Sequence, residues 1–115
     1  MKKIFISYNP NGKESDYINT LKNELESHEA QIYDTNYLET KYDNINSCDS
    51  FIAFVVGNSP NAMYDVGYAM SKNKKVLTVK ADCSETSFFL EMASTILLRD
   101  YFDTSRDILN FVDNC

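Results

Sequence analysis

Residues 51–69 read FIAFVVGNSPNAMYDVGYA, which combines an apolar run, a polar turn and the start of an amphipathic helix. The run at 51–56 is short and continuous, which is typical of a strand buried on both faces. Ser59 and Pro60 fit a helix start, because Ser is a favoured N-cap and Pro a favoured first helical residue. A strand, a turn and a helix N-terminus in this order predict an α/β fold.

The same alternation continues toward both ends of the chain. Strands are predicted at 3–8, 31–34, 51–56, 76–80 and 95–99, and helices at 14–28, 38–48, 61–72, 84–92 and 105–112. Strands that alternate with helices pair in parallel through right-handed crossovers, so we predict a three-layer α/β sandwich around about five parallel strands, flavodoxin-like or Rossmann-like. No linker or repeat interrupts the pattern, and residues 1–115 are expected to form a single domain.

Composition narrows the classes of function. The 115 residues carry a formal net charge of -6, and the Lys and Arg residues are scattered. Binding along a nucleic-acid backbone needs clustered basic side chains, so no nucleic-acid polymer is expected as a partner. Three cysteines without a close pair, together with one His, predict no metal site. The absence of a signal-peptide pattern or a long apolar run predicts a cytoplasmic protein with no membrane partner.

A candidate site follows from the predicted sheet, because ligands bind beyond the carboxyl ends of parallel strands. The unpaired N–H groups at the helix start after residue 56 favour a phosphate or a carboxylate there. Asp65 lies about one turn inside that helix and is the first candidate for a catalytic group. The residues expected to line the pocket are Tyr8, Asn9, Ser59, Asn61 and Asp65.

Each of these residues also has a purely structural interpretation. An acidic residue near a helix start stabilises the helix dipole by about 0.3–1 kcal/mol, which would account for Asp65. Ser59 before Pro60 is an ordinary N-cap. Tyr8 belongs to a chain with eight Tyr and seven Phe, so a packing role is equally open.

The stretch from 49 to 79 resembles the nucleoside 2-deoxyribosyltransferase family and the related 2′-deoxynucleoside 5′-phosphate N-hydrolases. The similarity is carried by Ser59, by the acidic residue within Tyr64-Asp65-Val66-Gly67-Tyr68-Ala69, and by the following Lys74-Lys75-Val76-Leu77-Thr78-Val79. The opening Lys3-Ile4-Phe5-Ile6-Ser7-Tyr8 is similar to Toll/interleukin-1 receptor (TIR) domains, some of which cleave NAD. Both families share the predicted sandwich and act on N-glycosidic bonds.

The resemblance implies an enzyme that cleaves or exchanges an N-glycosidic bond of a nucleoside, a nucleotide or an NAD-like ligand. Asp65 and Tyr8 would be catalytic, with Asp65 at the anomeric carbon and Tyr8 beside sugar or base. Asn9, Ser59, Asn61 and Met63 would bind the substrate, with Ser59 on the 5′-phosphate. No cofactor is implied, and a homo-oligomer is expected because family members commonly complete the pocket with a neighbouring subunit.

Four residues depart from the families' pattern. The position of Asp65 is a Glu in those families, and the position of Lys41 is usually an Asp. The glycines that usually follow the Ser are also replaced, with Asn61 and Met63 in their place. These departures keep a second hypothesis open, a nucleotide-binding or TIR-like protein-interaction module that has lost turnover.

Overall fold

The computed structural model describes residues 2–8, 15–34, 38–55, 60–80, 94–97 and 101–114. In chain order the elements are β1 (Lys2–Ser7), α1 (Ser15–Ser27), β2 (Ala30–Asp34), a 3-10 turn (Leu38–Thr40), α2 (Lys41–Ser47), β3 (Ser50–Val55), α3 (Pro60–Ser71), β4 (Lys75–Lys80), β5 (Ser94–Leu97) and α5 (Tyr101–Asp113). The helix predicted at 84–92 lies outside the described residues.

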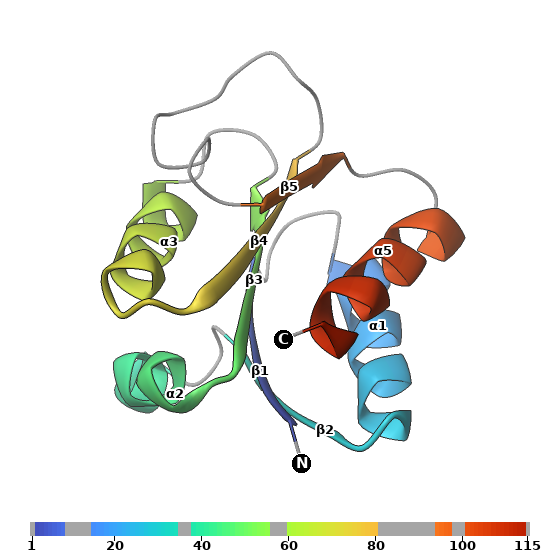
Figure 1. Ribbon diagram of the computed structural model, residues 1–115, viewed down its shortest axis with the longest axis horizontal. Coiled ribbons are helices and arrows are strands. Elements are labelled where there is room, and N and C mark those ends of the chain that lie inside the picture. The colour runs from blue at the N-terminus through green and yellow to red at the C-terminus, as the bar shows by residue number, and fades with distance from the viewer. Residues whose placement is uncertain are drawn as a thin grey trace.

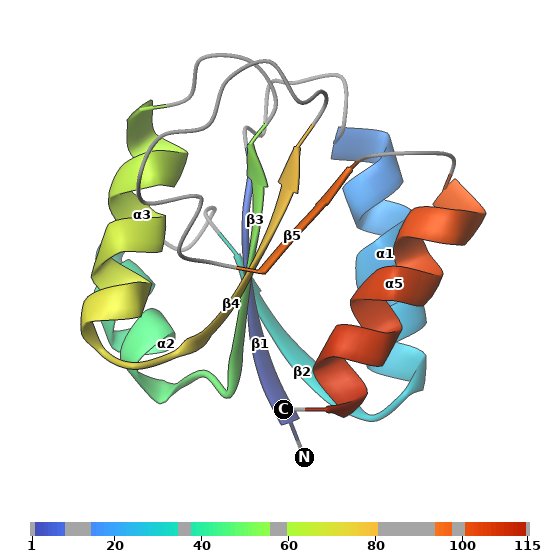
Figure 2. The same cartoon turned by 45° about the horizontal axis from the view of Figure 1, so that its top comes forward.

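The five strands form one parallel sheet in the order β2-β1-β3-β4-β5. Helices α1 and α5 cover one face of this sheet, and α2 and α3 cover the other (Figures 1 and 2). The predicted three-layer α/β sandwich with a parallel sheet is therefore confirmed.

Side-chain alternation along β1 divides the interior into two cores. Ile4 and Ile6 face α1 and α5, where they pack with Leu21 and Ile108. Phe5 faces the opposite way and stacks on its register partner Phe51, with ring centroids 5.5 Å apart. Because both faces of β1 are covered, its sequence is a continuous apolar run rather than an alternating one.

Two helix boundaries differ from the sequence prediction. The single helix predicted at 38–48 is a 3-10 turn followed by α2, and α5 begins at Tyr101 rather than at 105. The first turn of α5 is held by tertiary contacts: the Tyr101 ring lies 4.9 Å from that of Tyr17, and its hydroxyl donates a hydrogen bond of 2.5 Å to Glu24. Local sequence patterns do not contain such contacts between helices.

Cys48 is predicted to be chemically inert in the folded protein. Burial raises the pKa of its thiol to about 11, and its Sγ donates to the carbonyl of Ile45 at 3.1 Å. Since the thiolate is the reactive form, iodoacetamide at pH 8 should label Cys48 at least about 100-fold more slowly in the native protein than in urea. Peptide mass spectrometry measures this residue separately from the other cysteines. Equal rates in the two conditions would contradict the buried position of the thiol.

Candidate functional site

The strand order reverses beside β1, because the chain crosses from β1 to β2 on one side and later places β3 on the other. In open parallel sheets, ligands bind beyond the carboxyl ends of the strands at such a switch point. Ser7 ends β1 here and pairs in register with Ala53 of β3. The helix that follows β3, α3, begins at Pro60.

Asp65 points into the protein at this switch point. It lies on the inward stripe of α3 with Val66 and Ala69, and only 1% of it is exposed. Its Oδ2 accepts a hydrogen bond of 3.2 Å from the hydroxyl of Ser7, and its Oδ1 lies 2.8 Å from Nζ of Lys41. Three segments distant in sequence thus meet around one buried carboxylate.

The contact between Lys41 and Asp65 is an ion pair rather than a well-directed hydrogen bond. Within the described part of the chain, Oδ1 of Asp65 is buried and accepts no hydrogen bond of favourable geometry. The 2.8 Å separation still places the two charges in direct contact, so the ammonium balances the carboxylate electrostatically. The side chain of Lys41 is 15% exposed and is the more accessible partner.

Sequence reasoning did not identify Ser7 or Lys41 as partners of Asp65. The alternation along β1 carried a signal for Ser7, since it places this residue on the same face as Phe5. In the structure Lys41 begins α2, where a cation opposes the helix dipole, but the helix predicted at 38–48 did not place it at a helix start. Which residue it pairs with is decided by tertiary structure alone.

The structure does not bring Tyr8 together with Asp65. Tyr8 follows β1, is 7% exposed and packs in the core beneath α1, whereas Asp65 lies on the α2 and α3 side of the sheet. Nζ of Lys22 lies 3.5 Å from the Tyr8 hydroxyl and forms an ion pair with Asp34. Burial lowers the pKa of Lys22, but Asp34 and Tyr8 outweigh this effect and raise it overall. The catalytic role of Tyr8 stays a prediction.

The structure does not describe the surroundings of the other predicted site residues. Asn9 and Ser59 lie outside the described residues. Asn61 and Met63 belong to the first turns of α3, ahead of Asp65, and their side chains are not among those described. Their contacts with a substrate stay predictions.

Aromatic side chains border the ion pair on the outside of α2 and α3. Tyr42 and Tyr64 are exposed, and their ring centroids lie 6.1 Å apart. Nζ of Lys41 lies 5.6 Å from the Tyr42 ring centroid. The pKa of Tyr42 is raised by burial first, then by Tyr64 and by the charge of Asp65.

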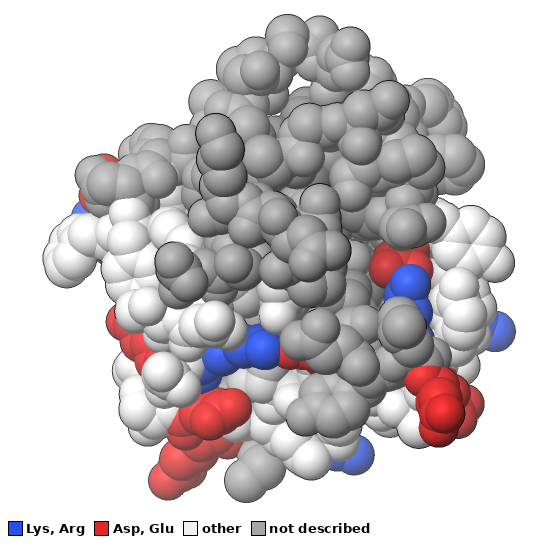
Figure 3. Space-filling view, turned by 180° about the vertical axis from the view of Figure 1, so that it is seen from behind, with Lys and Arg blue, Asp and Glu red and all other residues white. Residues whose placement is uncertain are grey.

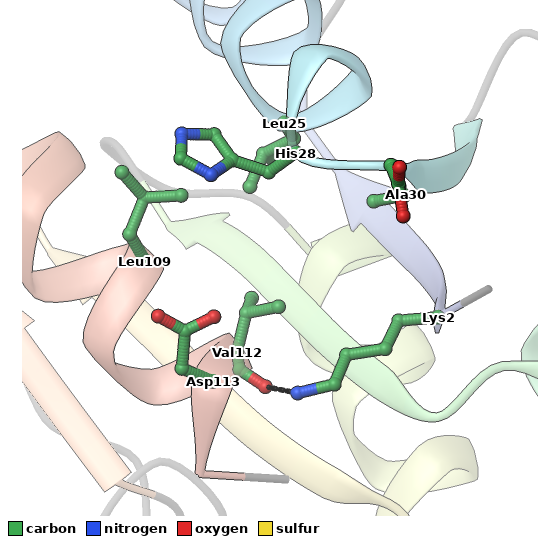
Figure 4. A pocket seen from close by; sticks show the side chains of 8 residues that line it. Lys2, Leu25, His28, Ala30, Leu109, Val112 and Asp113 are labelled. Atoms are coloured by element: carbon green, nitrogen blue, oxygen red, sulfur yellow. Dashed lines mark hydrogen bonds between the residues drawn. The ribbon is translucent and has the colours of Figure 1, made fainter.

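A hollow of about 260 Å³ lies elsewhere, between α1, α5 and the start of β2. Figure 4 shows Lys2, His28, Leu109 and Asp113 around it, with Nζ of Lys2 donating to the carbonyl of Val112 at 2.6 Å. This hollow is at the amino ends of β1 and β2. Because ligands of parallel sheets bind at the carboxyl ends, we favour the switch point as the candidate site.

Several features bear on the wider classes of function. On the face that Figure 3 shows, the described basic side chains are scattered, and some of them lie beside acidic ones. Among the described residues, no three His, Cys, Asp or Glu side chains are grouped so that they could hold a metal ion. No helix in the described ranges is long and apolar enough to cross a membrane.

No model of a protein family matches this chain, and neither does any curated protein. Solved structures do. A CMP N-glycosidase, BcmB, from Clostridium botulinum is 25% identical with a TM-score of 0.72, over 93% of this chain and 98% of that one. A 2-deoxyribosyltransferase from Bacillus psychrosaccharolyticus is 11% identical with a TM-score of 0.73, over 95% of each chain. A conserved protein from Enterococcus faecalis is also 11% identical, with a TM-score of 0.73, over 96% of this chain and 98% of that one.

Proposed function

We propose that this chain, which belongs to the nucleoside 2-deoxyribosyltransferase-like superfamily, cleaves or exchanges the N-glycosidic bond of a nucleoside or a nucleotide. The observation that carries the proposal is the buried carboxylate of Asp65 at the switch point of the sheet. The likeness to a CMP N-glycosidase over nearly the whole chain supports the same reaction class.

The chemistry of the bond explains why a carboxylate is needed there. Breaking the bond between C1′ and a base nitrogen develops positive, oxocarbenium-like character on the sugar. A carboxylate beside C1′ stabilises this charge or forms a covalent bond with the carbon, and water or a second base then accepts the sugar. Asp65 is the group we assign to this role, with Ser7 orienting its Oδ2 through a hydrogen bond.

The other predicted residues complete the proposal. Ser59 and the start of α3 would hold a phosphate, since helix N-termini favour anions. Asn61 and Met63 would line the same pocket. Asn9 would contact sugar or base, and Tyr8 would do so from the α1 side of the sheet. Family members commonly complete the pocket with a neighbouring subunit, so we propose a homo-oligomer, which sedimentation would test.

The proposal is tested by a search for released base. The protein is incubated with cytidine 5′-monophosphate, deoxynucleosides, deoxynucleotides and NAD, and the products are separated by chromatography. Free base or nicotinamide is expected from at least one of them. A second free base added to the mixture distinguishes exchange from hydrolysis, since only exchange yields a new nucleoside. Absence of base release from every compound would contradict the enzymatic proposal.

A second candidate function is nucleotide binding without turnover. The observation that favours it is the ion pair itself, because a carboxylate held by Lys41 at 2.8 Å is a weaker nucleophile than a free one. Isothermal calorimetry with the same compounds separates the candidates: binding with no product over hours supports a binding module. Absence of binding as well would point to the TIR-like interaction module.

A further inference from the structure

Lys41 places a positive charge directly beside the carboxylate on which the proposed function depends. Its Nζ lies 2.8 Å from Oδ1 of Asp65, and this oxygen accepts no hydrogen bond of favourable geometry from the described residues. The carboxylate is almost fully buried, whereas the side chain of Lys41 retains 15% exposure. A ligand that enters from solvent therefore reaches the ammonium more easily than the carboxylate.

A ligand that uses Asp65 has to weaken this ion pair. Separating the partners of a buried pair is unfavourable, because each is left with an uncompensated charge. A neutral nucleoside offers Lys41 no negative charge to replace the carboxylate of Asp65. A phosphate monoester carries almost two negative charges and accepts strong, charge-assisted hydrogen bonds from Lys. It can replace Asp65 as the partner of Lys41 and leave the carboxylate available.

We propose that Lys41 makes the switch-point site selective for ligands that carry a phosphate monoester, so that nucleoside monophosphates bind in preference to nucleosides. The inference rests on the proposed function, because it assumes that the ligand engages Asp65. It assigns a role to Lys41 at a position where the resembling families usually have an Asp. The contribution of Lys41 to this selectivity would therefore be specific to this chain, in addition to the phosphate contacts proposed at Ser59 and the start of α3.

The test compares affinities for cytidine and for cytidine 5′-monophosphate by isothermal calorimetry. The wild type should bind the monophosphate more tightly. In Lys41→Gln, whose amide can still donate to Asp65 but carries no charge, the preference should fall by at least about tenfold. Lys41→Arg should keep most of it, because the charge is retained. Thermal melting establishes that each variant is folded.

Lys72→Gln is the matched control. Nζ of Lys72 lies 5.6 Å from the Tyr68 ring centroid, the same separation as between Lys41 and Tyr42. This variant loses a lysine charge and a lysine–tyrosine contact at the far end of α3, and its preference for the monophosphate should equal that of the wild type.

Three results would overturn the inference. They are an unchanged preference in folded Lys41→Gln, an equal loss of affinity for both ligands, and the absence of binding of either ligand to the wild type. Failure of the proposed function gives a different pattern. If the monophosphate is preferred in a way that depends on Lys41 but no base is released, the proposed enzymatic function is refuted and the proposed selectivity is supported. If base is released at the same rate from ligands with and without a phosphate, and also in Lys41→Gln, the enzymatic function is supported and the selectivity is refuted.

Discussion

Lys41→Ala is expected to lower the free energy of unfolding by about 3 kcal/mol, because it leaves the carboxylate of Asp65 buried without a counter-ion. This is a large fraction of the total stability of a domain of this size, which is roughly 5–15 kcal/mol. The charge cannot relax into water, since Asp65 is 1% exposed and is fixed on the inward stripe of α3. Urea denaturation followed by circular dichroism measures the loss.

The two partners of the pair should not be equivalent. Asp65→Asn should cost only about 1 kcal/mol, because the partly exposed ammonium of Lys41 can turn toward solvent and the amide can keep the hydrogen bond from Ser7. The double variant Lys41→Ala with Asp65→Asn should therefore be more stable than Lys41→Ala alone.

Arg106→Ala is the control for burial, because it removes a cation from an ion pair on the protein surface. Arg106 forms an ion pair with Asp103 at 3.4 Å, and its side chain is 57% exposed. Loss of such a surface pair should change the stability by less than about 1 kcal/mol. If Lys41→Ala costs no more than Arg106→Ala, Asp65 is not a buried partner of Lys41, and the description of the site is wrong.

Asp65→Asn is expected to reduce base release by at least about 100-fold, the order of loss seen when a group that stabilises a developing charge is removed. The amide has nearly the shape of the carboxylate but carries no charge, so it neither stabilises an oxocarbenium ion nor bonds to C1′. The measurement is the initial rate of base release from whichever compound the wild type turns over. The effect should fall on kcat rather than on KM.

Asp103→Asn provides the matched substitution for this experiment. It makes the same chemical change in an ion-paired, helical Asp on α5, and its rate should equal that of the wild type. Full turnover in Asp65→Asn would refute the catalytic assignment while leaving the fold untouched. A rate lost equally in both variants would instead indicate a general loss of folded protein, which the urea experiment detects.

Much of the architecture could be predicted from the sequence. The apolar runs at the strands and the helical spacing of Ile18, Leu21 and Leu25 predict elements whose observed ends differ by one or two residues. These patterns are local consequences of burial on a sheet with both faces covered, so a single sequence contains them. The first turn of α5 is different, because its stability comes from the contact of Tyr101 with Tyr17 and Glu24 on α1.

The sequence by itself determined the parallel α/β sandwich and the position of Asp65 in the helix that follows the central strand. Both are encoded by hydrophobic periodicity and turn residues, which act over short distances along the chain. Only the tertiary structure decided that Lys41 and Ser7 meet Asp65, and that Tyr8 packs on the other face of the sheet. Such pairings depend on strand order and on the packing of separate helices, neither of which is encoded within one local segment. For the same reason the contact of Lys41, a departure from the resembling families, with Asp65 becomes visible only in the folded structure.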